Sequence, residues 1–277
     1  MVVSFIVRLV RLWGLYAKMD LAWLLRDRTT AILALLADIT TSLSGVGGIF
    51  LLAWRFDGIG GMGRYEVLFM LAYATLIAGV FNMFCAGNNG HVSRKIGRGQ
   101  FEHMFIQPMS LPLQLASEGF NPFTGGSGLV SGAALMVIAV SGLEAALPWW
   151  WVLSLIFNLF TTLAIILGLM YLASSLTFYA PVQAEEITSF IYDGLGHIGN
   201  FPLSGMPVYL QITLITAFPA GLMAWFPTMV MLGRAPAWYP PLFAIVLWII
   251  AVYFFKKGMK YYVERGINRY VNWGHRS

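Results

Sequence analysis

The chain has 277 residues, of which 58% are hydrophobic and only 10% are charged, and its mean hydropathy is +0.73 with a formal net charge of +5. Soluble globular proteins carry about 25% charged residues, so this composition excludes a soluble enzyme or binding domain and indicates a membrane protein. The single cysteine, Cys85, excludes an internal disulfide.

The first 28 residues predict an amphipathic helix in the plane of the inner leaflet. Basic residues alternate with apolar ones that recur at helical spacing, namely Phe5, Leu9, Leu12, Trp13 and Tyr16. This pattern is typical of interfacial helices, and its basic residues favour anionic membrane lipid. A plain basic flank that only sets the topology is the alternative.

Five runs with at most one charge each are long enough to cross the hydrocarbon layer as α-helices, which takes about 20 residues. They are Thr29–Trp54, Tyr65–Gly87, Phe123–Gly142, Trp149–Pro181 and Ala235–Phe255. Most of the 17 basic residues precede the first run, follow the second or follow the last. The positive-inside rule therefore places these segments and both termini in the cytoplasm.

Two cytoplasmic ends require an even number of crossings, so one more must lie before the last run. We expect a short in-plane helix at Ala184–Gly199, a fifth span at Pro207–Trp225 and a re-entrant turn on the outer side at Phe226–Gly233. The predicted fold is an all-α membrane protein with six transmembrane helices. It forms a single domain over residues 1–277, with a cytoplasmic tail at 256–277.

The most informative connection is the cytoplasmic loop 88–121 between the second and third spans. Phe101, Met104 and Phe105 fall on one face of a short helix that ends before Pro108. Such a helix can lie on the bilayer or fill a groove on a partner protein.

Three motifs resemble those of one known family. The loop reads Gly99-Gln100-Phe101-Glu102-His103-Met104-Phe105-Ile106-Gln107-Pro108, and it is similar to the loop of the membrane-spanning subunits of ABC type-2, exporter-like transporters. Phe218-Pro219 with Trp225-Phe226-Pro227 resembles the family's outer segment, and Gly266-Ile267-Asn268-Arg269-Tyr270 with Gly274 resembles its C-terminal signature. Relatives often carry an acid in place of Gln100 and a base in place of Gln107.

The resemblance implies a permease subunit of an ATP-driven transporter that exports a lipophilic or amphiphilic substrate across the inner or plasma membrane of a prokaryote. It implies two copies of an ABC ATP-binding subunit, which bind ATP and Mg²⁺, and a second permease subunit, identical or homologous. The chain has no G-x-x-x-x-G-K-[S/T] phosphate loop. We therefore expect no enzymatic activity and no cofactor in this chain, and no nucleic acid as a partner.

The family's cytoplasmic helix after span two contacts the ATPase. The resemblance extends this coupling role to Gly99, Phe101, Glu102, Met104, Phe105 and Pro108, with Phe101, Met104 and Phe105 as apolar anchors and Glu102 as a polar contact. Replacing Phe101 and Phe105 with Ala is then expected to uncouple ATP hydrolysis from transport without unfolding the spans.

Acidic residues are candidates for the pathway and its inner gate. Asp38 lies within the first span, where a charge is costly unless it faces protein or water. It is either a substrate or proton contact or a carboxyl that is neutral or hydrogen-bonded inside the protein. Glu185 and Glu186, with Asp193, form an acidic patch that is an inner gate, a contact for the basic N-terminal helix or a solvated face.

Two other functional classes and one packing question stay open. A self-sufficient secondary transporter or channel would show polar groups at mid-membrane in two repeated halves, and a lipid-modifying enzyme would show clustered His, Asp or Glu. The four histidines lack metal-ligand spacing, so no metal site is predicted. The small-residue pairs Ser44-x-x-x-Gly48 and Gly128-x-x-x-Gly132 predict close helix packing, within the chain or between subunits.

Overall fold

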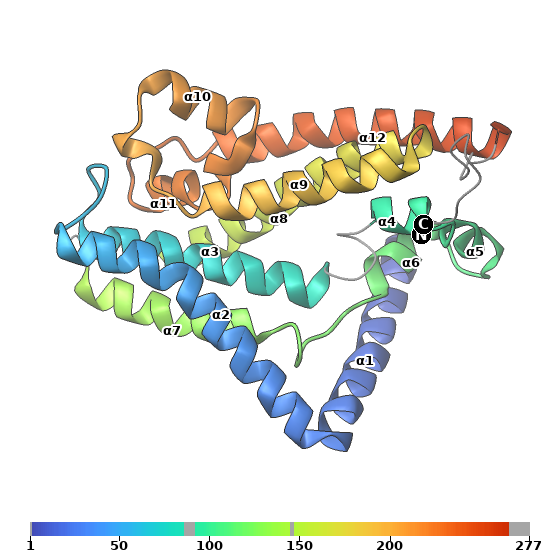
Figure 1. Cartoon of the computed structure of the whole chain (residues 1–277), viewed down its shortest axis with the longest axis horizontal. Coiled ribbons are helices and arrows are strands. Elements are labelled where there is room, and N and C mark those ends of the chain that lie inside the picture. Colours follow the sequence, from blue (N-terminus) through green and yellow to red (C-terminus); the bar gives the residue numbers. More distant parts are fainter. Residues whose placement is uncertain (1, 86–91, 145–146, 266–277) are drawn as a thin grey trace.

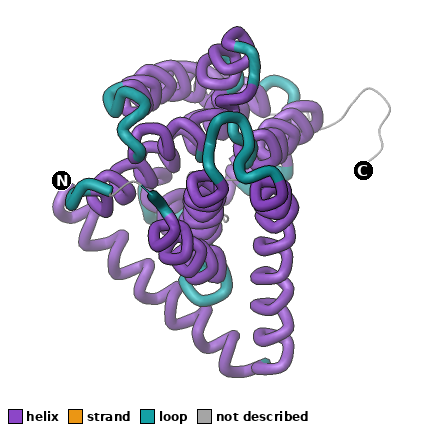
Figure 2. The backbone as a smooth tube through the Cα atoms, turned by 90° about the vertical axis from the view of Figure 1, so that its left-hand side faces the viewer, coloured by secondary structure: helices purple, strands orange, loops and turns teal. Residues whose placement is uncertain are grey.

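The computed structural model describes residues 2–85, 92–144 and 147–265, and the secondary structure of this part is helical (Figure 2). The helices long and apolar enough to cross a membrane are α2 (Arg28–Arg55), α3 (Arg64–Phe84), α8 (Trp151–Ser174) with its 3-10 continuation η1 (Ser175–Phe178), and α12 (Tyr239–Arg265). A shorter apolar helix, α7 (Ser127–Gly142), occupies the predicted third run. The all-α membrane fold is therefore confirmed, with helices at all five apolar runs.

The N-terminal helix α1 (Val2–Arg26) runs across one end of the bundle and meets α2 in a V that stands away from the other helices (Figures 1 and 2). Asp27 sits at the apex, and its Oδ1 accepts a hydrogen bond from the amide of Thr30 at 3.1 Å. Hydrogen bonds from Thr30, first its side chain and then its amide, lower the pKa of the Asp27 carboxyl. The carboxylate therefore caps the first turn of α2.

Two side chains attach α1 to the rest of the fold. The indole N–H of Trp13 donates to the carbonyl of Ala116 at 3.1 Å, and its ring packs against Phe84 and Phe120. Asp20 accepts hydrogen bonds from the amides just before α7 and from the hydroxyl of Thr124, which lies 2.8 Å away. The start of the third predicted span is thus capped by α1.

The central helix is α3, whose residues Val67–Tyr73 are all buried. The Tyr73 and Thr162 hydroxyls share a hydrogen bond of 2.8 Å that joins α3 to α8. Glycines let α3 and α7 approach closely, since a Cβ on Gly79 would lie 2.4 Å from the amide nitrogen of Leu129. On α7, a Cβ on Gly132 would lie 2.7 Å from the amide nitrogen of Leu76. The pair Gly128-x-x-x-Gly132 is therefore an internal packing seam.

The structure confirms one part of the predicted assignment of residues 184–233 and contradicts another. A helix was expected at Ala184–Gly199, and α9 (Pro181–Gly199) is present there and runs beside α8 along the bundle (Figure 1). The expected fifth span at Pro207–Trp225 is interrupted, because α10 (Val208–Thr216) has only nine residues and Pro219 begins a separate 3-10 turn, η3 (Pro219–Leu222).

Short helices close the end of the bundle opposite α1. They are η2 (Leu203–Gly205), α10, η3 and α11 (Trp225–Met231), where α11 falls on the predicted re-entrant turn. The Trp225 indole N–H donates to the hydroxyl of Ser204 at 2.8 Å, and the Tyr239 hydroxyl donates to the carbonyl of Ile215 at 2.9 Å. These bonds tie the cap together and join it to α12.

Some predicted features lie outside the described residues. These are the C-terminal motif at 266–270 with Gly274, and the first residues of the loop, 88–91.

Candidate functional site

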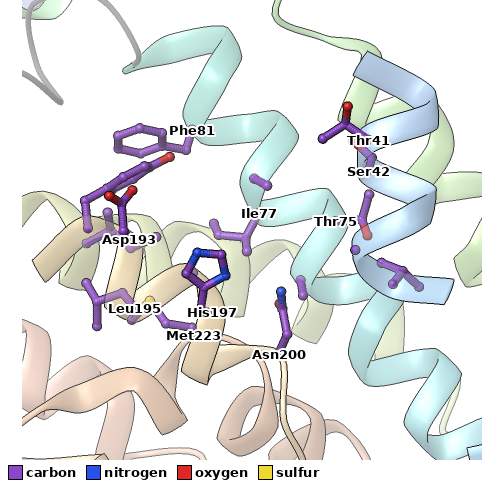
Figure 3. Close-up of a pocket in the computed structure, with 17 residues that line it drawn as sticks. Thr41, Ser42, Thr75, Ile77, Phe81, Asp193, Leu195, His197, Asn200 and Met223 are labelled. Atoms are coloured by element: carbon purple, nitrogen blue, oxygen red, sulfur yellow. The ribbon is translucent and has the colours of Figure 1, made fainter. Parts of the chain in front are cut away.

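A cavity of about 480 Å³ lies between α2, α3 and α9 (Figure 3). Most of its walls come from α3 and α9, and α2 closes one side. The lining combines aliphatic and aromatic side chains with polar ones from all three of these helices. The polar and charged side chains in it are Thr41, Ser42, Thr75, Tyr192, Asp193, His197 and Asn200.

Helix α9 supplies the ionisable groups of this cavity. Asp193, His197 and Asn200 are spaced i, i+4 and i+7, so they fall on one face of the helix, and Figure 3 shows them in a row toward α3. Among the described residues, none of these three side chains makes a hydrogen bond or ion pair with the protein. Beside them, the Phe81 and Tyr192 rings pack with centroids 5.1 Å apart. The cavity thus offers unpaired polar groups next to an aromatic wall.

The α2 wall is built from small residues. Thr41, Ser42 and Gly45 face the cavity near the middle of the helix. A Cβ added at Gly45, or at Gly196 on α9, would meet no atom within 4 Å. Space for a ligand therefore exists on both sides.

Asp38, the predicted pathway residue, is not part of this lining. It lies one turn from Thr41 on α2, and the hydroxyl of Ser127 at the start of α7 lies 3.4 Å from its Oδ2. The structure therefore places Asp38 at an α2–α7 contact.

The loop between α3 and α7 folds into three short helices, α4 (Val92–Gly97), α5 (Phe101–Ile106) and α6 (Leu111–Ser117). Gly99 allows the sharp turn between α4 and α5, because its φ of 69° is the left-handed conformation that favours glycine. The Gln114 amide donates to the carbonyls of Met104 and Met109, each at 2.8 Å, and so holds α5 against α6. The predicted helix before Pro108 is therefore present and tightly braced.

The apolar face of α5 packs inward. Phe101 is fully buried and Met104 is 5% exposed, and Phe101 lies in an aromatic cluster with Phe178, Phe255 and Tyr262. These two predicted anchors hold the loop to its own bundle, whereas the sequence analysis assigned them to a partner. Phe105 is 45% exposed, and its role as a partner contact stays a prediction.

Sequence reasoning missed the most exposed apolar side chain of the loop. Ile106 is 80% exposed and Met109 is 37% exposed, next to Phe105. A helix of six residues has two sides that can each contact something. The aromatic Phe101 packs against other aromatic rings of the chain, and this leaves Ile106 on the exposed side. The exposed apolar patch of the loop consists of Phe105, Ile106 and Met109.

The acidic residues assigned to an inner gate lie in different environments. Glu185 contacts Arg94 on α4 and Arg98 just after it, with the Arg94 Nε 3.1 Å and the Arg98 Nη2 3.8 Å from its Oε1. Glu186 is exposed on the next position of α9. Asp193, two turns further along, belongs to the cavity. In the loop itself, Glu102 is exposed and accepts a hydrogen bond of 2.9 Å from the Tyr262 hydroxyl on α12.

The family described as "ABC-2 family transporter protein" matches residues 41–266, a region that includes the cavity-lining positions from Thr41 on, the loop helices and α12. The chain belongs to the ABC-2 transporter family. It is thus a multi-pass membrane permease of an ABC transporter, a type of subunit that works with an ABC ATP-binding subunit. No curated protein and no solved structure matches it.

The ABC-2 permease match begins near the middle of α2, so α1 and the first half of α2 precede it. Within the matched region the structure brings together side chains that are far apart in the sequence, Thr41 and Ser42 with Asp193 and His197. It keeps the loop residues of this permease at the α1 end of the bundle, away from the helical cap (Figure 1).

Proposed function

We propose that this ABC-2 permease carries an amphiphilic substrate through the cavity between α2, α3 and α9, powered by ATP that separate subunits hydrolyse. The observation that supports this proposal is the position of α9. This helix supplies Asp193 and His197 to the cavity, and Glu185 near its N-terminus is ion-paired to the cytoplasmic loop. One rigid element therefore touches both the substrate site and the part that an ATPase would move.

The proposed topology has six crossings, by α2, α3, α7, α8, α9 and α12. With 19 residues at a rise of about 1.5 Å each, α9 is about 28 Å long, close to the thickness of the hydrocarbon layer. The end of α12 lies at the same end of the bundle as α1 and the loop (Figure 1). That end carries Lys256, Lys257 and Lys260, so the positive-inside rule makes it cytoplasmic. The α10–α11 cap then lies on the outer side.

A second permease subunit is proposed to cover α9. Phe190, Asp193 and His197 recur at i, i+3 and i+7, so they form one stripe, and all three are exposed. A stripe with a carboxylate and an imidazole inside a membrane has to face protein or water and not lipid. A partner permease across this face would enclose the cavity and keep it accessible to substrate.

The cavity composition supports an amphiphilic substrate. Phe81, Ile77 and Met223 provide apolar contact, and Asp193, His197 and Asn200 provide hydrogen-bonding groups on the same wall. Binding sites for drug-sized ligands combine apolar walls with a few placed polar groups in this way. Export, rather than import, follows from the resemblance to exporter-like members of the family.

The ATPase is proposed to dock on Phe105, Ile106 and Met109. These side chains form the exposed apolar patch of the loop. Because Phe101 and Met104 are packed against α12 and η1, force on this patch is transmitted to the bundle through a rigid contact.

The test is reconstitution of the chain in lipid vesicles with its ATP-binding subunit and a panel of amphiphiles. We expect ATP-dependent transport, and ATPase stimulation by the transported compounds only when both subunits are present. Solute movement by the chain without an ATPase would overturn the proposal and favour a self-sufficient transporter. A complex that hydrolyses ATP with no response to any amphiphile would overturn the assigned substrate class.

A further inference from the structure

The N-terminal part of α9 is held by the first helix of the cytoplasmic loop. Arg94 lies on α4 and Arg98 just after it, one turn apart, and both approach the same carboxylate oxygen of Glu185. Between them, a Cβ on Gly97 would lie in ordinary van der Waals contact with α9, 3.5 Å from Glu185 Oε2 and from the carbonyl oxygen of Pro181. The Glu185 side chain is 28% exposed, less than either arginine. Helix α4 therefore both packs against α9 and pairs with it electrostatically.

This contact lies on the same helix as the cavity groups. Asp193 is eight positions after Glu185, about 12 Å along the axis, and His197 is about 18 Å away. The intervening helix is uninterrupted from Pro181 to Gly199. A displacement of Glu185 along or around the axis therefore moves Asp193 and His197 as one body relative to α2 and α3.

The other end of the loop is tied to a different helix. Helix α5 packs through Phe101 on α12 and is bonded through Glu102 to Tyr262. Helix α12 contributes no residue to the cavity lining. The loop thus contacts both α9, at Glu185, and α12, at Phe101 and Glu102, and the contact at Glu185 leads along α9 to the cavity.

We propose that Glu185 is a positioning residue, and that its ion pair with Arg94 and Arg98 passes the movement of the cytoplasmic loop to the cavity-lining helix α9. This inference rests on the proposed function of the chain as an ATP-driven permease. Partly exposed ion pairs contribute little to stability, so the pair can be removed without loss of the fold. The ion pair at Glu185 therefore couples the loop to the cavity and does not serve mainly to stabilise the fold.

The test uses the full complex with its ATP-binding subunit in lipid vesicles and compares Glu185→Gln with Glu186→Gln. The two variants remove the same charge at adjacent positions. Of these two glutamates, Glu185 forms ion pairs with Arg94 and Arg98, and Glu186 is exposed. We expect Glu185→Gln to lower the amount of substrate moved per ATP by about fivefold or more, the lower range of measured couplings between sites. Basal ATPase activity, substrate binding and melting temperature stay at the wild-type level, and Glu186→Gln behaves as wild type.

A charge exchange separates an ion pair from a general need for an acid at this position. The variant that combines Glu185→Arg with Arg94→Glu and Arg98→Glu restores the attraction with reversed signs, and we expect it to recover most of the coupling lost in Glu185→Arg alone. If Glu185→Gln does not assemble, the charge-exchange variant still tests whether the ion pair is needed for coupling. Normal coupling in Glu185→Gln, or no recovery in a folded exchange variant, would overturn the inference. A wild-type complex that does not transport at all would instead overturn the proposed function.

Discussion

The hydroxyl of Tyr262 on α12 donates a hydrogen bond to the carboxylate of Glu102 on α5 across 2.9 Å. This bond lies at the edge of the aromatic cluster around Phe101 and links the long apolar helix α12 to the loop between α3 and α7. Tyr262 has a buried ring and a hydrogen-bonded hydroxyl at the same contact. It therefore fixes both the distance and the rotation of α5 relative to α12.

Replacing Tyr262 with Phe removes this hydrogen bond and keeps the ring. We expect a loss of about 0.5–1.5 kcal/mol in the free energy of unfolding and a smaller yield of transport per ATP. Tyr261→Phe is the matched control, because its ring packs against Tyr179 at 4.7 Å and its position lies outside the Phe101 cluster. Unfolding in detergent and coupled transport in vesicles are the measurements, and equal effects of both variants would contradict a specific role for the bond.

Phe101 and Phe105, which the sequence analysis treated as one apolar surface, are expected to behave differently. Phe101→Ala empties a fully buried site and should cost about 3–5 kcal/mol of stability. Phe105→Ala removes a 45% exposed ring and should change stability by about 0.5 kcal/mol or less, while it weakens ATPase binding. Melting temperature and co-purification of the ATPase separate the two effects. Loss of ATPase binding in Phe101→Ala with an unchanged melting temperature would speak against the packing described here.

Filling the cavity is expected to block transport and leave the fold intact. Gly196→Leu adds a side chain where a Cβ meets nothing within 4 Å, so we expect normal expression and melting temperature but no amphiphile-stimulated ATPase activity. The contrasting variant is Gly132→Leu, whose Cβ would lie 2.7 Å from the Leu76 nitrogen. Overpacking of this kind costs about 1–3 kcal/mol or more. A Gly196→Leu complex that is stimulated as strongly as wild type would remove the cavity from the pathway.

The cap formed by η2, α10, η3 and α11 is clamped to α3 by Arg234, which donates to both carboxylate oxygens of Glu66, with Nη1 at 2.9 Å. The hydrogen bond to Glu66 raises the pKa of Arg234. Arg234→Lys keeps the charge but loses the two-pronged geometry, and we expect a stability loss of about 1 kcal/mol. Arg64→Lys serves as control, since its pair with Asp57 is longer, at 3.8 Å, and more exposed. Melting temperatures at low and high salt measure both, and equal shifts would show that the geometry at Glu66 adds nothing.

Much of the fold follows from local sequence pattern. The apolar runs at α2, α3, α8 and α12 were predicted closely, because each is uniform enough in hydrophobicity to be recognised without its neighbours. The helix expected at Ala184–Gly199 is present as α9. Its packing beside α8 could not be predicted from hydrophobicity, because that contact depends on how helices distant in the sequence meet. The continuous fifth span was wrong because the chain breaks at Pro219.

The sequence did not predict the cavity, and of the lining residues it singled out only Asp193, as part of an acidic patch. Glu185 was identified as an acidic residue of interest, with the N-terminal helix as one possible partner, and its partners are Arg94 and Arg98 of the loop. His197 had been set aside as one of four scattered histidines, yet it faces Thr41 and Ser42 across a cavity. No spacing rule connects residues on α2 and α9, because their proximity depends on how α3 packs between them.

The sequence by itself determined that this protein is a helical membrane permease. The free energy of transferring a segment into lipid is close to a sum over its residues. The loop motif is also contiguous in the sequence, so both features can be recognised without knowing the tertiary contacts. The tertiary structure alone decided that Phe101 faces inward, that α9 belongs to the bundle and that α2, α3 and α9 enclose a cavity. Those outcomes depend on packing between distant segments, such as Phe101 with Phe178 and Phe255, whose energies appear only when the helices meet.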